Sequence, residues 1–508
     1  MTYTELMALS PLQRFWYKFT QFIKSIPSGL GKFFCAIGTG IKNFFVSVGK
    51  AIANYFVGFV KGDIITKLSY FIMGLGNACR GQIVKGLIFF AIEVLYILFM
   101  VFFGANFLGL FVNLEALVTQ VELPGGFMGK PLVQDVYTHT SIEILLFGIL
   151  VIMVSIAAIA IYFVSVKSAR KCEEIVKAGG KPKTMKQEVK DLLDAKFHTT
   201  LLSLPIVLIC VFVLLPLIFM IVMAFTNFEI NHYNSFNWTG MENFGEIFST
   251  SSGKGASMGM TFAKIVGWTL IWAVFATFSN YILGMVVALM INKKGIKLKK
   301  VWRTMFVMTI AVPQFVTLLL MAKMLGSDPN SPLNLIVSFL SGGTADPINL
   351  FSPANNGFLA RLTVILVNIW VGIPYTILMT TGILMNIPED LYESARIDGA
   401  GPFKSFTKIT LPYMLFVTTP YLITTFIGNV NNFNVIYLIT GGEPKVGEYK
   451  YAAGKTDLLI TLLFKLSVDQ KKYGLGAAIG ILVFIVCATL SLVTFNMTKS
   501  AKNEEEFS

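Results

Sequence analysis

Apolar segments of about 20 residues recur along the chain and are separated by shorter polar stretches. A helix of about 20 residues is long enough to cross the hydrocarbon core of a bilayer. The pattern therefore predicts an all-α polytopic membrane protein. Its eight expected transmembrane helices lie near residues 86–112, 141–166, 200–225, 264–291, 302–325, 359–386, 411–440 and 474–498.

The remaining stretches are of different kinds. Residues 1–85 are basic and aromatic, which predicts an amphipathic cytoplasmic region on the membrane surface. A further span within 44–60 is the alternative. Residues 456–466 are apolar but too short to cross, which predicts a re-entrant or interfacial helix. The chain then divides into 1–85, 86–199 (two spans and a polar cytoplasmic linker), 200–500 (a six-span core with a polar loop at 387–412) and 501–508 (an acidic cytoplasmic tail).

Composition supports a membrane protein and excludes a soluble domain. Hydrophobic residues make up 55% of the chain, and charged residues only 14%. The mean hydropathy is +0.70. Soluble domains carry about 25% charged residues. The five cysteines form no disulfide framework, because they fall in cytoplasmic or apolar segments.

The distribution of basic residues predicts the orientation in the membrane. Lysine and arginine are concentrated before the first span, in 167–199 and in 293–303, whereas the alternate loops at 113–140 and 227–263 carry one lysine each. By the positive-inside rule, both termini and the loop at 387–412 face the cytoplasm. The net charge of +13 is then mainly a topology signal, and nucleic acid is not an expected partner.

The loop at 387–412 is long and mixed in charge, unlike a simple connection between two spans. Pro388 suits a first helical position, and Glu389 and Asp390 suit the positive end of a helix. Gly399 can end that helix in the left-handed conformation, and Pro402 can begin the next one. These residues predict a helical elbow that docks on a partner in the cytoplasm.

This elbow resembles the EAA loop of binding-protein-dependent ABC importer permeases. The matching positions are Glu393, Ala395, Gly399, Ile409, Leu411 and Pro412, with Ser394 in place of the middle alanine. The resemblance implies contact with a separate ATPase. The residues expected to carry that coupling are Glu393, Ala395, Asp398, Gly399 and Pro412.

The sequence shows no catalytic or metal-binding constellation. Gly454-Lys455-Thr456 supplies the end of a phosphate-binding loop, but Tyr449 occupies its first glycine position. The three histidines are isolated, and no cysteine pair has ligand spacing. We therefore expect a transporter subunit rather than an enzyme, with no metal site and no cofactor of its own.

Polar residues at helical spacing mark two faces inside spans, where polar groups are costly in lipid. In the sixth and seventh spans these residues recur at i, i+3, i+4 and i+7. Amides, hydroxyls and an aromatic ring suit a sugar, but helix packing explains the same pattern equally well. Asn431 and Asn434 point to other faces and are expected to be packing or boundary residues. The two faces comprise Asn368, Val371, Gly372, Tyr375, Thr425, Gly428, Asn429 and Asn432.

Residues 200–500 resemble the MalF-type subunit of maltose/maltodextrin importers. The resemblance rests on runs such as Asn368–Tyr375, Asn431–Phe433 and Tyr473–Ala478. It places the family's sugar contacts on the eight residues of the two faces. It also implies a MalG-like second permease subunit, two MalK-like ATPase subunits that bind ATP and Mg, and an extracellular sugar-binding protein.

The resemblance also indicates where the protein works and what it carries. The outside loop at 227–263 is short, whereas the enteric MalF protein carries a large domain there. This favours the cell membrane of a Gram-positive bacterium, with a lipid-anchored binding protein. Maltodextrin is the expected substrate, and raffinose-type or galacto-oligosaccharides stay open.

Two functions of other classes compete with this reading. A secondary sugar transporter would need a coupling carboxylate such as Glu93, the one acid well inside a span, although no basic residue pairs with it clearly in the sequence. A polytopic membrane enzyme would show clustered His, Asp or Glu, which the sequence lacks.

Overall fold

The computed structural model describes residues 38–40, 42–43, 46–47, 49–50, 53–123, 132–250, 256–293 and 295–497. The acidic tail at 501–508 and most of the aromatic run before residue 53 lie outside these residues. The chain forms two compact units, residues 1–240 and 241–508.

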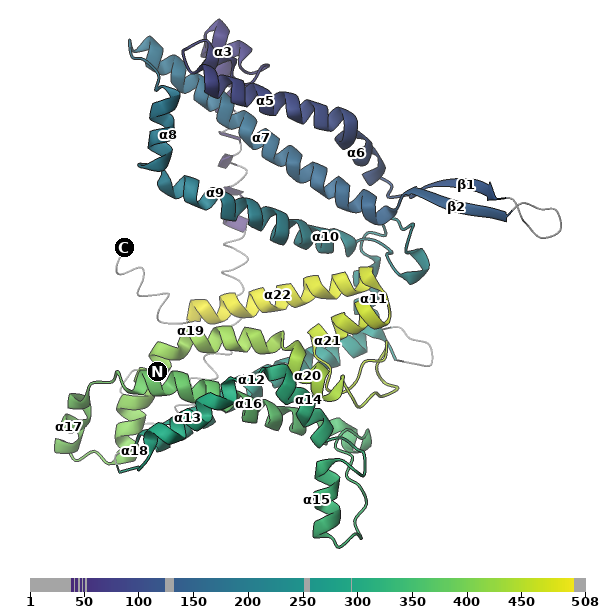
Figure 1. Ribbon diagram of the computed structural model, residues 1–508, viewed down its shortest axis with the longest axis vertical. Helices are drawn as coiled ribbons and strands as arrows, with labels where there is room; N and C mark the ends of the chain where they lie inside the picture. The colour runs from purple at the N-terminus through teal and green to yellow at the C-terminus, as the bar shows by residue number, and fades with distance from the viewer. Residues whose placement is uncertain are drawn as a thin grey trace. The chain divides into compact units, whose positions relative to one another are not determined.

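The first unit is built on long apolar helices. Helices α5 and α6 continue one another through a π-helical turn, and they run beside α7 (Figure 1). The helix α7 runs past the expected membrane boundary into the predicted polar linker. A helix at 53–61 precedes the elements α3 (Ile64–Leu68), α4 (Leu75–Ala78), α5 (Ile83–Phe99), α6 (Ala105–Phe111), α7 (Ser141–Lys177), α8 (Met185–Leu193), α9 (Phe197–Ile209) and α10 (Leu215–Met223).

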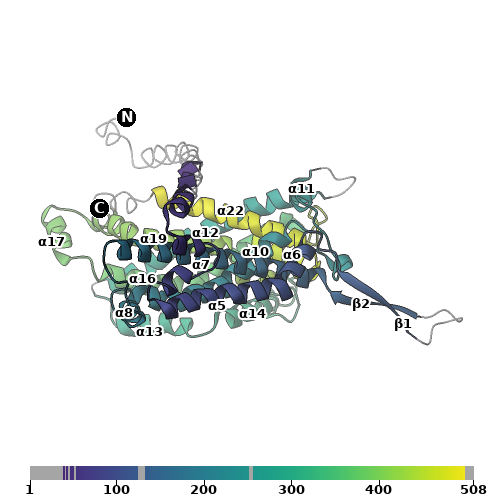
Figure 2. The same cartoon turned by 90° about the horizontal axis from the view of Figure 1, so that it is seen from above.

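A β-hairpin interrupts the helices of this unit. Strands β1 (Leu117–Leu123) and β2 (Leu132–His139) pair antiparallel between α6 and α7. Figure 2 shows the hairpin extending beyond the end of α6. We predicted only a loop here, although the valines and threonines on both sides of Gly125-Gly126 are typical of a hairpin. The all-α class is otherwise confirmed.

The second unit contains a bundle in which α12 packs against α16 and α19, and α19 packs against α22 (Figure 1). Its helices are α11 (Glu242–Phe248), α12 (Met258–Asn292), α13 (Lys299–Ile310), α14 (Gln314–Met324), α15 (Pro332–Leu340), α16 (Phe358–Leu384), α17 (Glu389–Ile397), α18 (Pro402–Ser405), α19 (Leu411–Val430), α20 (Phe433–Thr440), α21 (Leu459–Phe464) and α22 (Tyr473–Met497).

Seven helices in the described part of the chain are long and apolar enough to cross a membrane. The eighth expected span, at 302–325, is not one straight helix: α13 and α14 meet at an angle of 86°. Pro313 explains the break, because proline removes a backbone donor and disfavours a helical residue before it. The expected span at 411–440 is also interrupted, since α19 ends at Val430 and α20 begins at Phe433.

Two tryptophans of α12 anchor the core of the second unit. The side chains of Trp268 and Trp272 are buried beside Leu318, Val435 and Leu458. Each indole N–H donates a hydrogen bond of 3.1 Å to a backbone carbonyl, one at Thr456 and one at Asn429. These bonds attach α12 to the end of α19 and to the loop before α21, and so position the polar residues at the end of α19.

Candidate functional site

A polar cleft lies where α19 ends and α20 begins. It has a volume of about 410 Å³ and contains four of the eight residues predicted to contact a sugar. The cleft is lined by Gln314, Thr425, Gly428, Asn429, Asn431, Asn432, Phe433 and Asn434. A side chain could extend from Gly428 without meeting other atoms, since nothing lies within 4 Å of the position of its Cβ.

Local sequence explains the shape of this cleft. Asn432 caps α20, and its side-chain oxygen accepts a bond of 3.2 Å from the backbone N–H of Val435. The amide of Asn432 donates to the side-chain oxygen of Asn429, and the amide of Asn429 donates to the hydroxyl of Thr277 on α12 at 2.9 Å. The bond from the Val435 N–H to the Asn432 side chain is a helix cap, a position at which asparagine is favoured. The two amides are therefore held in fixed orientations at the cleft wall.

Two residues of the cleft were expected to have another role, and one was missed. Asn431 and Asn434 are boundary residues as expected, at the end of α19 and the start of α20, and the Asn431 amide also bonds Cys487 of α22, but both line the cleft as well. Gln314 was missed altogether. It comes directly after the break at Pro313, at the start of α14. A glutamine next to a proline within an apolar segment was a usable signal for such a position.

The predicted face on α16 lies elsewhere in the second unit. Asn368 is buried, Val371 packs against the tryptophan core, and the side chain of Tyr375 is 45% exposed. A Cβ on Gly372 would lie 2.5 Å from the amide nitrogen of Asn280, so this glycine allows the close approach of α12 and α16. None of the four residues lines the cleft.

Asn280 and Asn368 form an incompletely satisfied polar pair between α12 and α16. The side-chain oxygen of Asn280 and the side-chain nitrogen of Asn368 are buried without a hydrogen-bond partner among the described residues. The amide of Asn280 donates to the backbone carbonyl of Ala276 at 2.9 Å and to that of Asn368 at 3.4 Å. Unpaired buried polar atoms are uncommon and costly, and neither residue lines the cleft at the junction of α19 and α20.

The elbow predicted at 387–412 forms as a helix followed by a tight turn. Helix α17 begins directly after Pro388 and carries Glu389 and Asp390 in its first turn. Asp398 caps it, and Gly399 follows in the left-handed conformation with φ +71°. Figure 2 shows α17 at one end of the second unit. The helix is therefore a polar projection connected to the bundle at both ends.

The elbow also has features that the sequence analysis missed. Ile397 and Phe403 lie on either side of the turn between α17 and α18, and they are 86% and 79% exposed. Behind α17 lies a second cleft of about 810 Å³, lined in part by Glu389, Tyr392 and Glu393. The phenol of Tyr392 hydrogen-bonds the hydroxyl of Thr410 at 2.8 Å, which connects α17 to the base of the next span.

The other expected coupling residues lie around the same elbow. Ala395 is half-buried, whereas Glu393, Asp398, Gly399 and Pro412 are exposed. Residues 402–430 form one continuous helical segment of 29 residues, which includes a π-helical turn at Phe406–Thr410. This segment connects the elbow directly to the cleft residues of α19.

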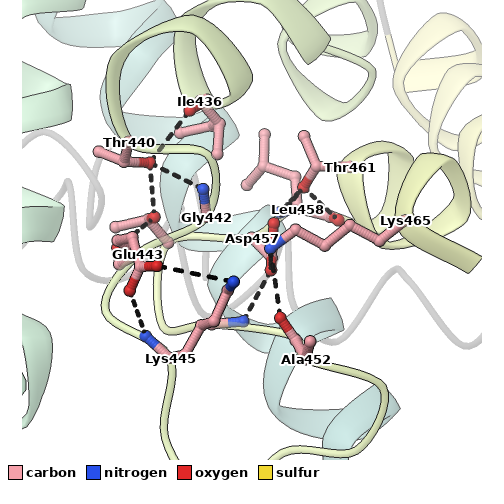
Figure 3. A network of polar contacts seen from close by, with 12 residues as sticks. Ile436, Thr440, Gly442, Glu443, Lys445, Ala452, Asp457, Leu458, Thr461 and Lys465 are labelled. Carbon is pink, nitrogen blue, oxygen red and sulfur yellow. Dashed lines mark hydrogen bonds and ion pairs between the residues drawn. The ribbon is translucent and has the colours of Figure 1, made fainter. Parts of the chain in front are cut away.

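A buried ion pair supports the loop that follows α20 (Figure 3). The ammonium of Lys465 lies 2.7 Å from the carboxylate of Asp457, and the two side chains are 5% and 0% exposed. The carboxylate also accepts bonds from the backbone N–H of Gly454 and the hydroxyl of Thr461. Burial raises the pKa of the Asp457 carboxyl, and the Lys465 ammonium and these donors oppose the rise.

The same network fixes the far end of α20. Thr440, its last residue, accepts a bond from the backbone N–H of Gly442, and its hydroxyl lies 2.9 Å from that of Thr456. We expected a re-entrant or interfacial helix at 456–466. Helix α21 is indeed short, but Leu459 and Leu462 are buried in the protein. The ion pair was missed because its partners come from a loop and a following helix.

We expect Lys465→Met to lower the free energy of unfolding by about 3–5 kcal/mol, because it leaves the Asp457 carboxylate buried without its partner. Thermal unfolding of the purified protein in detergent measures this change. Lys264→Met breaks an exposed pair with Glu448 and is the matched control, with an expected loss below about 1 kcal/mol. Equal losses in the two variants would contradict a structural role for the buried pair.

Comparison with known proteins places these features in a family. Residues 280–499 match the family described as "Binding-protein-dependent transport system inner membrane component". The galactooligosaccharides transport system permease protein GanP of Bacillus subtilis (strain 168) is 32% identical over 87% of this chain and 99% of its own length. The chain belongs to this family of transport permeases.

Other relatives agree with this assignment. The maltodextrin transport system permease protein MdxF of Bacillus subtilis (strain 168) is 30% identical over 85% of this chain and 95% of its own. The maltose/maltodextrin transport system permease protein MalF of Escherichia coli (strain K12) is 34% identical over 51% of this chain and 49% of its own. The permease is accordingly a multi-pass transport component and not an enzyme.

Proposed function

We propose that this permease is a membrane subunit of an ATP-driven oligosaccharide importer, with maltodextrin as its substrate. The observation that carries the proposal is the cleft at the junction of α19 and α20, inside a membrane bundle. Its volume of about 410 Å³ falls in the range of small-molecule sites. The MdxF and MalF relatives, both named for maltose or maltodextrin transport, support the substrate.

The chemistry of the lining suits a sugar. Amide side chains both donate and accept hydrogen bonds, as hydroxyl groups require. The ring of Phe433 belongs to a cluster in which it lies 4.7 Å from the ring of Tyr437 and 4.9 Å from that of Phe464. Such a ring can cover the apolar C–H face of a pyranose while the amides bind its hydroxyls. Asn368, Val371, Gly372 and Tyr375 are proposed as a second wall in another state of the transport cycle.

Coupling to ATP follows from the elbow. We propose that ATP and Mg bind two separate ATPase subunits, that a second permease subunit completes the pathway, and that an extracellular lipid-anchored binding protein delivers the sugar. Closure of the ATPases would move α17, and the helical segment 402–430 would carry that movement to Thr425 and Asn429. This is alternating access driven by a rigid connection. Both termini would face the cytoplasm of a Gram-positive bacterium.

Galacto-oligosaccharides are the second candidate substrate, because GanP shares 32% identity over 87% of the chain. Uptake of radiolabelled maltodextrins and galacto-oligosaccharides by a strain lacking the gene, with and without its restoration, separates the two. Restoration of maltodextrin uptake alone supports the proposal. Uptake of galacto-oligosaccharides alone would replace the substrate, and uptake that persists after removal of the ATPases would reject the ATP-driven importer.

We expect Gln314→Ala and Asn434→Ala to raise the KM for sugar uptake about fivefold each, because each removes about one hydrogen bond, worth ~1 kcal/mol. Transport assays in proteoliposomes with all subunits measure this. Thr419→Ala is the matched control: its hydroxyl bonds the backbone carbonyl of Leu415 on the same helix, outside the cleft. If the cleft variants and the control have equal KM values, the cleft does not bind the sugar.

A secondary transporter coupled through Glu93 gains no support from the structure. The carboxylate of Glu93 accepts a hydrogen bond of 2.8 Å from the backbone N–H of Met73. A carboxylate with this bond has a structural role in the first unit, where it holds the turn before α4.

A further inference from the structure

Residues 53–85 form a small folded motif whose interior holds a polar network beside the buried side chains of Tyr70 and Met73. Asp63 accepts bonds from the guanidinium of Arg80 at 2.6 and 2.8 Å and from the backbone N–H of Thr66 at 2.7 Å. The guanidinium also donates to the hydroxyl of Thr66 and to the backbone carbonyl of Ala169 on α7. The Arg80 side chain is 5% exposed.

The same pattern continues along α7. The backbone N–H of Asp63 donates to the carboxylate of Glu173, which is itself buried. The amide of Asn77 donates to Gln82 at 2.7 Å and to Ser168 at 2.8 Å. The buried polar groups of the motif, among them Thr66 and Asn77, thus find their partners inside the protein.

The outside of the motif is apolar. Large hydrophobic side chains point away from the polar interior, with exposed fractions between 60% and 77%. They come from the helix at 53–61, from α3, from the turn before α4 and from the start of α5. The most exposed of them are Phe56, Val60, Ile64, Phe71 and Ile83.

This arrangement is the reverse of that in a water-soluble fold. In water, apolar side chains are buried and charged ones are exposed. In a bilayer the polar groups must be satisfied internally, and the outer surface is apolar. The apolar surface is also continuous with a membrane span, because Ile83 and Leu87, which is 58% exposed, belong to the spanning helix formed by α5 and α6. This continuity identifies lipid as the occupant of the surface.

Basic residues place the motif within the depth of one leaflet. Lys61 and Lys67 lie within it, and Arg170 and Lys171 lie near the end of α7. Lysine and arginine concentrate where spans meet the anionic cytoplasmic surface. From the polar interior, the apolar exterior and this basic border, we infer that residues 53–85 are immersed in the cytoplasmic leaflet, with Ile64 and Phe71 in contact with acyl chains.

The inference differs from the amphipathic region predicted for residues 1–85. An amphipathic segment lies flat with one apolar face and one wet face. Here Arg80, Thr66 and Asn77 are enclosed, whereas the Asp63 side chain is 39% exposed, so lipid covers the apolar side of a folded motif that is attached to α7. The motif therefore contributes to the membrane domain, and it does not depend on the identity of the transported sugar.

Nitroxide accessibility in the full-length protein tests this inference. Single cysteines at positions 64 and 71, in a variant whose five native cysteines are replaced, carry the label in phosphatidylglycerol-containing nanodiscs. Phe212, 71% exposed on a membrane span, is the lipid-facing reference, and exposed Ala178, beyond α7, is the water-facing reference. Nitroxide labels at positions 64 and 71 should be as accessible to dissolved oxygen as the label at position 212. A water-soluble nickel chelate should not broaden their spectra.

Two outcomes would overturn the inference. Nickel access at positions 64 and 71 equal to that at position 178 would place the motif in water. Shielding from both reagents would mean that protein covers the surface instead of lipid. If the cysteine-free chain does not fold, Phe71→Trp in the native background provides the readout. Brominated acyl chains should then quench the fluorescence of the added tryptophan. Ala178→Trp is the water-facing control, and if Phe71→Trp is quenched no more than this control, position 71 does not contact lipid.

Discussion

Gly399→Val is expected to lower the rate of sugar uptake at least about tenfold, while the protein still inserts into the membrane. Gly399 has φ +71°, a conformation that costs an ordinary residue about 1–3 kcal/mol and a β-branched one more. The strain falls on the turn between α17 and α18 and would change the direction of the elbow. On the proposed mechanism, movement of the ATPases would then no longer reach residues 402–430. If the strain makes the coupled arrangement of the elbow less stable by about 1.4 kcal/mol, the population of that arrangement falls about tenfold.

Gly401→Val is the matched control for this prediction. Gly401 lies two residues away with φ −68°, and no atom lies within 4 Å of the position of its Cβ. The control therefore adds the same side chain to the same turn without backbone strain. Uptake and ATP hydrolysis, measured together in proteoliposomes, separate coupling from folding. Normal uptake by Gly399→Val, or equal losses in both variants, would contradict a role for the turn conformation in coupling.

The second large effect is expected at the apolar surface of the elbow. In Ile397→Asp combined with Phe403→Asp, co-purification of the ATPase subunits should be lost. The two side chains are among the most exposed apolar groups of the second unit. If they are buried on docking, they contribute about 3 kcal/mol or more, which is at least about a hundredfold in affinity. Pull-down of tagged permease, followed by ATPase assay of the eluate, measures this loss.

Phe339→Asp is the control for the docking prediction. Phe339 is 85% exposed on α15, in the segment between the fifth and sixth expected spans, which the charge pattern predicts to lie outside the cell. On that predicted orientation, the substitution changes an equally exposed aromatic residue on the side away from the ATPases. Retention of the ATPases in the elbow variant, or their equal loss from the control, would show that Ile397 and Phe403 are not the docking surface.

Much of the fold could be predicted because its signals are local. A bilayer requires continuous apolar helices, so hydropathy alone located most of the spans. Pro388, Gly399 and Pro402 mark the elbow through their own backbone preferences, and α17 begins and ends where they predict. Helical spacing likewise grouped Thr425, Gly428 and Asn429 on one side of α19, and all three line the cleft.

Other features depended on tertiary packing. Gln314 joins the cleft only because the chain bends by 86° at Pro313 and brings another segment beside α19 and α20. The face of Asn368 and Gly372 has the same spacing as that of α19, yet it packs against Asn280 of α12. Spacing identifies residues that share a helix face, but it does not say which neighbour that face meets.

The sequence by itself determined the membrane class, the positions of most spans and the elbow, because these follow from hydropathy and from the backbone limits of proline and glycine. Only the tertiary structure decided the pairing of Asp457 with Lys465 and of Asp63 with Arg80. It also decided that the polar side of residues 53–85 faces inward. A charged group in an apolar environment is stable only beside a partner, and that partner is chosen by the path of the chain in three dimensions.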